Sequence, residues 1–116
     1  MRVKLINDKF LSLLGLCQKA GKMISGSMQC ESAIRSGKAY LVIISEEASE
    51  ATKDEFTHLC TSRDLPFIIA GGKDELGSAI GKYSRTLLAV SDSAFKDMLL
   101  KEYREIQHGG DRLWQK

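Results

Sequence analysis

The chain has 116 residues, enough for one folded domain with a buried core but too few for two. Hydrophobic residues make up 43% and charged residues 28% of the sequence, which is typical of a globular domain and excludes a disordered chain. The formal net charge of +2 does not identify a partner, whereas the short apolar runs exclude a membrane-spanning segment.

The first third of the chain predicts a helix, a short strand and a second helix. An apolar-periodic run that is capped at Asn7 stops near Gly21, which indicates the first helix. Residues 23–25 predict a short strand. Residues 27–36 then predict a second helix, which Gly37 ends.

The rest of the chain alternates continuous apolar runs, typical of strands buried on both faces, with segments of helical spacing. The strands are expected at 40–45, 67–70 and 85–91, and the helices at 49–60, 73–80 and 92–104. Either Ser91 or Asp92 is expected to cap the last helix.

This alternation predicts an α/β fold, a three-layer α/β/α sandwich in which helices cover both faces of a small, mostly parallel or mixed sheet. We expect a single domain over residues 1–106. Residues 107–116 contain a Gly-Gly pair and are expected to form a flexible tail. Because the helices leave no spare apolar face on the sheet, we expect a monomer.

The cysteines indicate a reducing compartment. The chain has three cysteines, Cys17, Cys30 and Cys60. This odd number and the lack of Cys-x-x-Cys spacing argue against both a metal site and a disulfide framework. Each lies on an apolar helix stripe, where a buried small hydrophobe is expected. Residues 1–8 are too short and too charged for a signal peptide, so we expect a cytoplasmic protein.

Charge is unevenly distributed along the chain. Residues 15–45 carry Lys19, Lys22, Arg35 and Lys38 against one acid, Glu31, whereas residues 46–64 carry six acids and two bases. A molecule with a basic face and an acidic face approaches a polyanion in a definite orientation.

Catalytic patterns have little support in this sequence. His58 and His108 have no nucleophile at a meaningful spacing, and the adjacent acids Glu46 and Glu47 need not converge on a metal. Residues 71–73 read Gly-Gly-Lys but lack the phosphate-loop frame. We therefore expect no enzymatic activity, no cofactor and no metal.

The segment around Gly26 is a candidate anion site. A helix that begins at Gly26 and Ser27 exposes unpaired N–H groups and the positive end of its dipole, here with Lys22 as the flanking charge. The alternative is that Gly21 and Gly26 only turn the chain and that Lys22 is a solvated charge.

Several motifs follow one another in a fixed order and spacing. They are Gly21-Lys22, Ile24-Ser25-Gly26, Arg35-Ser36-Gly37-Lys38-Ala39, residues 41–49, Leu65-Pro66-Phe67 and residues 76–82. With them the chain resembles, over most of residues 7–105, the kink-turn RNA-binding family of ribosomal proteins, the L7Ae and L30e group, and above all its small bacterial YlxQ-type members. The resemblance implies a non-enzymatic protein that binds structured, kinked RNA, ribosomal or other non-coding, and not DNA.

The resemblance also implies roles for the start of the second helix. Most of the family reads Thr-Asn-Glu there, with a Lys three residues further on, and the Asn, Glu and Lys bind guanine edges of tandem sheared G·A pairs in a widened groove. The corresponding residues here are Ser27, Met28, Gln29 and Ser32. Gln29 can still exchange hydrogen bonds with a base, but Met28 cannot and Ser32 lacks reach and charge. The alternative is a protein-interaction module on the same fold that has lost RNA readout.

A second contact is implied at the loop Lys82-Tyr83-Ser84-Arg85. By resemblance this loop covers an extruded nucleotide, for which Tyr83 offers a stacking face and Arg85 a charge. The alternative is a solvated turn with Tyr83 packed on Ile80.

The small-residue spacing from Gly77 to Gly81, in the helix before this loop, is interpreted as a site of close backbone packing. The full set of expected RNA contacts is Lys22, Gly26, Ser27, Met28, Gln29, Ser32, Lys38, Lys82, Tyr83, Ser84 and Arg85.

Overall fold

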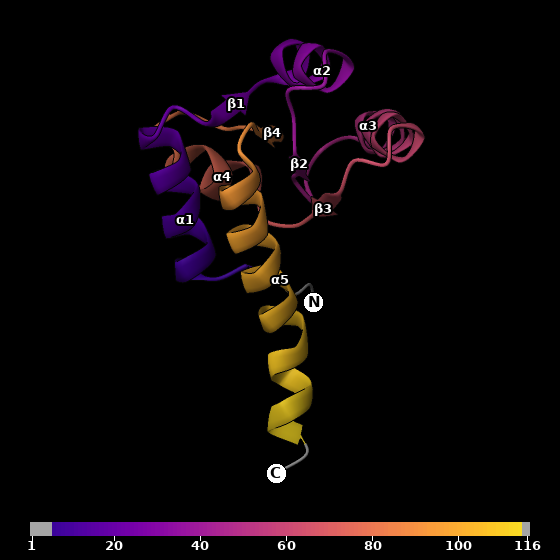
Figure 1. Cartoon of the computed structure of the whole chain (residues 1–116). Helices are drawn as coiled ribbons and strands as arrows, with labels where there is room; N and C mark the ends of the chain where they lie inside the picture. The colour runs from indigo at the N-terminus through magenta and orange to yellow at the C-terminus, as the bar shows by residue number, and fades with distance from the viewer. Residues whose placement is uncertain (1–5, 115–116) are drawn as a thin grey trace.

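The computed structural model describes residues 6–114, with side chains up to Gln107. Five helices and four strands alternate along this part of the chain (Figure 1). In order they are α1 (Asp8–Lys19), β1 (Met23–Ser25), α2 (Ser27–Arg35), β2 (Leu41–Ile44), α3 (Glu50–Ser62), β3 (Phe67–Ile69), α4 (Lys73–Ala79), β4 (Leu87–Val90) and α5 (Ser93–Trp114).

The strands form one mixed sheet in the order β1-β4-β2-β3. Only β2 and β3 pair in parallel, and β4 runs antiparallel to both β1 and β2. The mixed sheet is confirmed, but the expectation that it could be mostly parallel is wrong, because β4 inserts between β1 and β2 in the opposite direction. As a result β1, β2 and β3 all run the same way.

Alternation along the central strands divides the core into two halves. Leu41 and Ile43 of β2 pack with α1, α4 and α5, whereas Val42 and Ile44 pack with α2 and α3. Figure 1 shows α1, α4 and α5 on one side of the sheet and α2 and α3 on the other. The expected three-layer α/β/α sandwich is confirmed.

Side-chain caps explain where three helices begin. The side chain of Asn7 accepts a hydrogen bond from the Phe10 N–H at 2.9 Å. The Ser49 side chain caps α3 by accepting a hydrogen bond from the Thr52 N–H at 3.1 Å. Of the two caps expected for α5, Asp92 is the one observed, and its carboxylate accepts a hydrogen bond from the Phe95 N–H at 2.9 Å.

The three cysteines are free and fully buried, as expected for small core residues. Burial raises the pKa of Cys17 to about 11, with a smaller contribution from the nearby Asp92 carboxylate. Burial also raises the pKa of Cys60 to about 11 and that of Cys30 to about 12, the latter also through the neighbouring Cys60. These thiols are therefore neutral in the folded protein near pH 7.

Helix α5 is longer than the sequence indicated. Its expected end near Arg104 is wrong, because the helix continues to Trp114 through the Gly109-Gly110 pair. A glycine inside a helix costs about 1 kcal/mol relative to alanine and does not by itself end the helix. Figure 1 shows the last turns of α5 extending away from the other elements. The flexibility expected for residues 107–116 stays a prediction, and its last two residues lie outside the described part.

Candidate nucleic-acid interface

The junction between β1 and α2 depends on Gly26. This residue has φ 100° and ψ 151°, a backbone conformation that is essentially restricted to glycine. Its N–H donates to the Leu87 carbonyl of β4 at 3.2 Å, and its carbonyl accepts from the Cys30 N–H at 2.9 Å. No side chain caps α2, so the first N–H groups of this helix are left to other acceptors.

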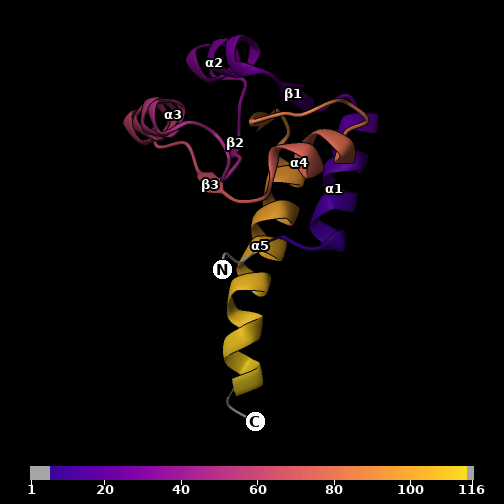
Figure 2. The ribbon, with the colours of Figure 1, turned by 180° about the vertical axis from the view of Figure 1, so that it is seen from behind.

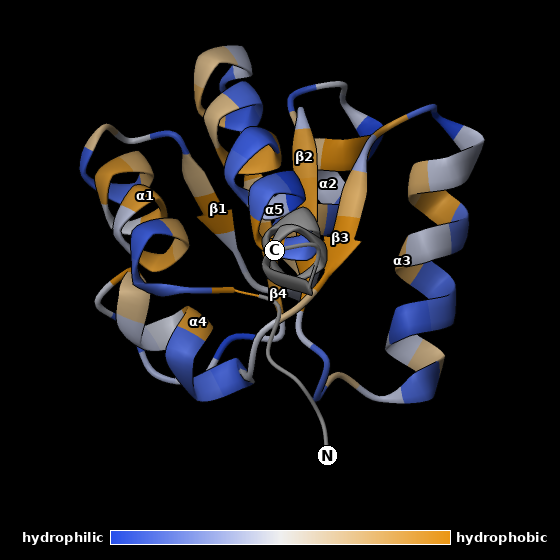
Figure 3. Ribbon diagram, turned by 90° about the horizontal axis from the view of Figure 1, so that it is seen from below, coloured by the Kyte–Doolittle hydropathy of each residue, from blue (hydrophilic) through white to orange (hydrophobic). Residues whose placement is uncertain are grey.

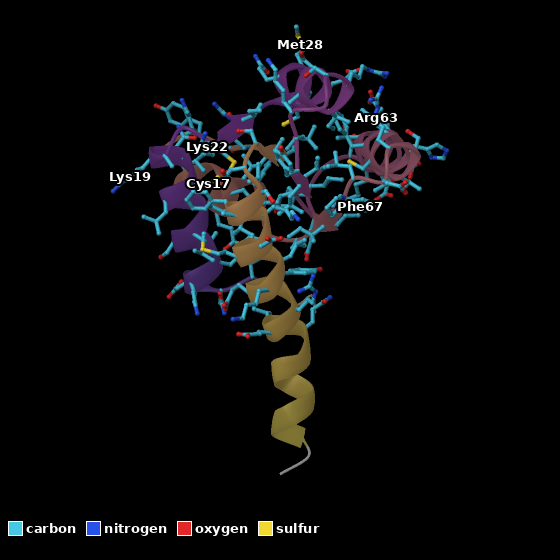
Figure 4. The ribbon with its side chains drawn as sticks, viewed as in Figure 1. Cys17, Lys19, Lys22, Met28, Arg63 and Phe67 are labelled. Carbon is cyan, nitrogen blue, oxygen red and sulfur yellow. The ribbon has the colours of Figure 1, made fainter. Side chains whose placement is uncertain are left out.

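A shallow groove of about 330 Å³ runs along the outer side of α2. Its lining residues are Ile24, Met28, Gln29, Ser32, Ala33, Ser36 and Lys38. The structure thus brings together four of the expected contacts, from the start of α2 to the loop beyond its end. Met28 is 79% exposed, and Figure 4 shows it pointing away from the body of the protein.

The loop at residues 82–85 lies against the β1–α2 junction. The Arg85 Nε donates to the Ser25 Oγ at 3.3 Å, and one terminal guanidinium nitrogen of Arg85 donates to the Ser84 carbonyl at 2.9 Å. This contact joins residues 60 positions apart and places the loop beside the start of α2. Seen from behind, the segment joining α4 to β4 runs beside β1 (Figure 2).

The side chains of this loop face solvent. Tyr83 is 91% exposed, so the alternative in which its ring packs on Ile80 is wrong. Ser84 donates to the Asp74 carboxylate at 2.6 Å, which ties the loop to α4. Lys82 and Tyr83 therefore project from a loop that is held at both Ser84 and Arg85.

Gly77 explains how the loop comes so close to α4. A Cβ added to Gly77 would lie 1.8 Å from the Tyr83 carbonyl oxygen, a distance that no side chain allows. The interpretation of this small-residue helix as close backbone packing is confirmed.

Lys22 lies apart from the start of α2. Its carbonyl accepts from the Ser91 N–H at 2.9 Å and from the Ser91 Oγ at 3.1 Å, which fixes it at the opposite end of β1 from Gly26. With about 3.3 Å per residue of extended chain, the two residues are about 13 Å apart. The expectation that Lys22 flanks the helix start is therefore wrong, because an extended strand separates them.

Lys22 and Lys38 share the edge at which β1 and β2 begin. Met23 and Leu41 both lie opposite Val90 of β4, and the Tyr40 N–H donates to the Val90 carbonyl at 2.7 Å. The expected contacts thus form two groups, one at each end of α2. Figure 3 shows the loops that lead into β1, β2 and β3 along one edge, at the top of the view.

Sequence reasoning did not single out two residues at this edge. Arg63 donates to the Arg35 carbonyl at 3.3 Å, and Tyr40 is 44% exposed. Both lie just before a strand that runs parallel to β1, so the strand direction would have been needed to find them.

Among the described residues, no group of three or more His, Cys, Asp or Glu side chains could hold a metal ion. Glu47, one of the two acids considered for a metal, accepts a hydrogen bond from the Lys73 N–H at 2.8 Å instead.

No helix among the described residues could cross a membrane. The surface offers cations, N–H groups, amides and aromatic rings, which bind anions and bases.

Residues 8–99 match the model of the ribosomal protein L7Ae/L30e/S12e/Gadd45 family. The RNA-binding protein YlxQ of Bacillus subtilis is 34% identical over 92 residues, which cover 79% of this chain and 92% of the relative. The large ribosomal subunit protein eL30 of Tetrahymena thermophila is 33% identical, with 85% and 97% of the two chains covered. A solved structure of a Bacillus halodurans protein of unknown function superimposes with a TM-score of 0.83 at 35% identity, and the match covers 85% of this chain and all of that one. The chain therefore belongs to the ribosomal protein L7Ae/L30e/S12e/Gadd45 family.

Proposed function

We propose that this protein is a non-enzymatic binder of structured RNA, ribosomal or other non-coding, and that it clamps a bent, bulged stem. Helix α2 enters the groove of the stem, and the loop at residues 82–85 covers the bulge. The named functions of the YlxQ and eL30 relatives support this proposal. The free thiols suit a reducing compartment, so we expect this activity in the cytoplasm.

The observation that carries the proposal is the contact between Arg85 and Ser25. It holds the exposed ring of Tyr83 beside the uncapped start of α2. N–H groups at a helix start and the flanking cations suit phosphates, while an exposed aromatic ring suits an unpaired base. A bulged stem presents both of these features at one point.

Base readout by α2 is expected to be reduced. Met28 and Ser32 line the groove where most of the family has an amide and an ammonium. Met28 has no N–H or O–H group for a guanine edge, and Ser32 lacks the reach and the charge of a lysine. The proposed recognition therefore depends on the shape of the bend and on phosphates, with Gln29 as the remaining side chain that can bind a base edge.

The test compares a stem that carries a three-nucleotide bulge with the same stem fully paired, each at two salt concentrations. We expect salt-dependent binding with a preference for the bulged stem. Tyr83→Ala should lower affinity for the bulged stem by about tenfold, since base stacking on an aromatic ring is worth about 1–3 kcal/mol, and should leave the paired stem unaffected. His58→Ala, an exposed change on α3, is the control.

A protein-interaction module is the second candidate, and the exposure of Met28 beside Ile24 in the α2 groove favours it. If neither RNA is retained at physiological salt, the RNA proposal is contradicted and this candidate replaces it.

A further inference from the structure

A group of cations lies at the edge where β1, β2 and β3 begin. We call Lys22, Lys38, Tyr40 and Arg63 the strand-start cluster. Lys22 precedes β1 directly, and Lys38 and Tyr40 precede β2. Arg63 follows α3, and Figure 4 shows it between α2 and α3. The loops that carry this cluster lie along the top edge of the view in Figure 3.

The topology brings these residues together. Because β1, β2 and β3 run in one direction, the helices that precede them all end at the same edge of the sheet. Val90 marks this edge, since it lies opposite both Met23 and Leu41. The hydrogen bond from Arg63 to the Arg35 carbonyl connects the end of α3 to the end of α2. Residues from three separate loops thus form one surface.

The two lysines of this cluster are not ion-paired with any described residue. Neither the Lys22 nor the Lys38 ammonium has an ion-pair partner within residues 6–107. Arg35 is paired with Glu31 at 2.9 Å and is not counted. Two acids lie at the same edge: Asp64, which follows Arg63, and Asp92, whose carboxylate caps α5. The edge retains an excess of positive charge.

Helix capping accounts for only part of this cluster. A cation stabilises a helix end when it lies within the last turn or binds the last carbonyls, as Arg63 does for α2. Lys22 and Lys38 each lie three residues beyond the end of the preceding helix, where the dipole effect has fallen off.

We infer that the strand-start cluster is a second phosphate-binding site for the same RNA, reached along the α2 groove. This inference rests on the proposed function. The groove lined by Met28 at one end and Lys38 at the other connects the cluster to the Gly26 junction. Helix α2 has nine residues and is about 13 Å long. An RNA stem held at Arg85 and extended along α2 reaches Lys38 after a few base pairs.

The chemistry of the cluster favours a phosphate chain over a protein partner. Its cations Lys22, Lys38 and Arg63 are spread over three loops. A row of separated charges matches regularly spaced phosphates, and the half-exposed ring of Tyr40 adds a hydroxyl donor.

The test uses two RNAs with the same bulge, a long one whose stem continues past the end of α2 and a short one whose stem stops near Ser32. We expect Lys38→Gln/Arg63→Gln to lower affinity for the long RNA by about tenfold and to reduce the slope of log K against log salt by about 1.4–1.8, since each phosphate contact contributes about 0.7–0.9. The short RNA should be unaffected. Arg63→Gln removes the charge but shortens the side chain that reaches the Arg35 carbonyl, so the melting temperature of the variant is compared with that of wild type to check the end of α2. Adding Lys22→Gln should lower the slope further.

Lys101→Gln/Arg104→Gln on α5 removes the same charge from another surface and should change neither RNA. Tyr83→Ala should weaken both RNAs equally, because both carry the bulge. If wild type binds the long RNA but Lys38→Gln/Arg63→Gln leaves its affinity and salt slope unchanged, or weakens both RNAs equally, the second site is refuted and the proposed function stands. If wild type binds neither RNA, the proposed function itself fails.

Discussion

At the scale of single residues, Gly26 holds the junction on which the proposed interface depends. Gly26→Ala would place a Cβ 2.6 Å from the Gln29 Oε1 and would require φ 100°, so we expect a loss of about 1–3 kcal/mol in the free energy of unfolding. Gly21→Ala is the matched control, because Gly21 also has positive φ but has open space around it. Urea denaturation of both variants checks this. Equal losses would show that the conformation of Gly26 and its contact with Gln29 together cost an alanine no more than the conformation of Gly21 does.

In the proposed interface, Met28 and Ser32 decide how strictly the bases of the RNA are read. We expect wild type to bind a standard kink-turn weakly, with little penalty when its tandem G·A pairs are replaced by Watson–Crick pairs. Met28→Asn/Ser32→Lys should restore discrimination by roughly ten- to a hundredfold, because one good bidentate base contact is worth about 1–3 kcal/mol in DNA grooves. The measurement is the ratio of affinities for the two RNAs. A steep ratio in wild type would mean that Gln29 and the Gly26 backbone suffice.

At the scale of elements, the loop at residues 82–85 depends on its packing against α4. We expect Gly77→Ala to displace the loop, since the new methyl group would overlap the Tyr83 carbonyl. The amide chemical shifts of residues 82–85 should move, and affinity for the bulged stem should fall. Ser78→Ala, one position along and exposed, is the control. Unchanged loop shifts in Gly77→Ala would show that α4 moves in place of the loop.

The elements themselves were largely predictable, because their signals are local. The caps at Asn7 and Ser49 and the apolar run of β2 each lie within a few residues of the structure that they specify. The end of α5 was missed because glycine only raises the cost of a helix. The contact between Arg85 and Ser25 was not predicted, since no local pattern specifies a pairing between residues so far apart in the chain.

Local sequence signals are also insufficient to predict the whole candidate site. The positions along α2 came from the family resemblance, and Met28, Gln29 and Ser32 do line one groove with Lys38. The separation of Lys22 from Gly26 could have been inferred from the strand predicted at residues 23–25, whereas the position of Arg63 required the shared direction of three strands. That direction is a property of the sheet, which no local pattern of residues shows.

At the scale of the whole molecule, the buried thiols link stability to pH. Their pKa values are raised to about 11 or 12 in the folded protein, above an ordinary value of 9.0. Below pH 9 the thiols are neutral in both states and this contribution to stability is fully present. Above pH 9 only the unfolded thiols ionise, so the free energy of unfolding falls by up to about 1.4 kcal/mol per pH unit for each thiol until the folded pKa is reached.

Urea denaturation at pH 7.5 and pH 10.5 measures this effect. Cys60→Ala should be less stable than wild type at pH 7.5, because it leaves a cavity, but should lose less stability between the two pH values. Lysine and tyrosine titrations are common to both proteins and cancel in the comparison. Equal losses would show that Cys60 ionises in the folded state as readily as in the unfolded state.

We also predict a monomer, since helices cover both faces of the described sheet. Sedimentation at two protein concentrations should give the mass of one chain, and a dimer that persists on dilution would contradict this.

Amide exchange of residues 108–114 should be fast, because a short helical end that extends away from the fold is marginal in water. Slow exchange there would show that this end of α5 is held by another contact.

The position of β1 at the edge of the sheet has a dynamic consequence. This strand spans three residues and pairs with β4 alone, so its release breaks fewer hydrogen bonds than the loss of β2 or β4 would. Lys22 lies at one end of β1 and Gly26 at the other, so a single opening event would displace both groups of the proposed interface together. An RNA that engages both ends would close this opening and should slow amide exchange in β1 more than in β3, the other three-residue edge strand. The affinity of the protein for such an RNA would then include the work of keeping this edge strand in place.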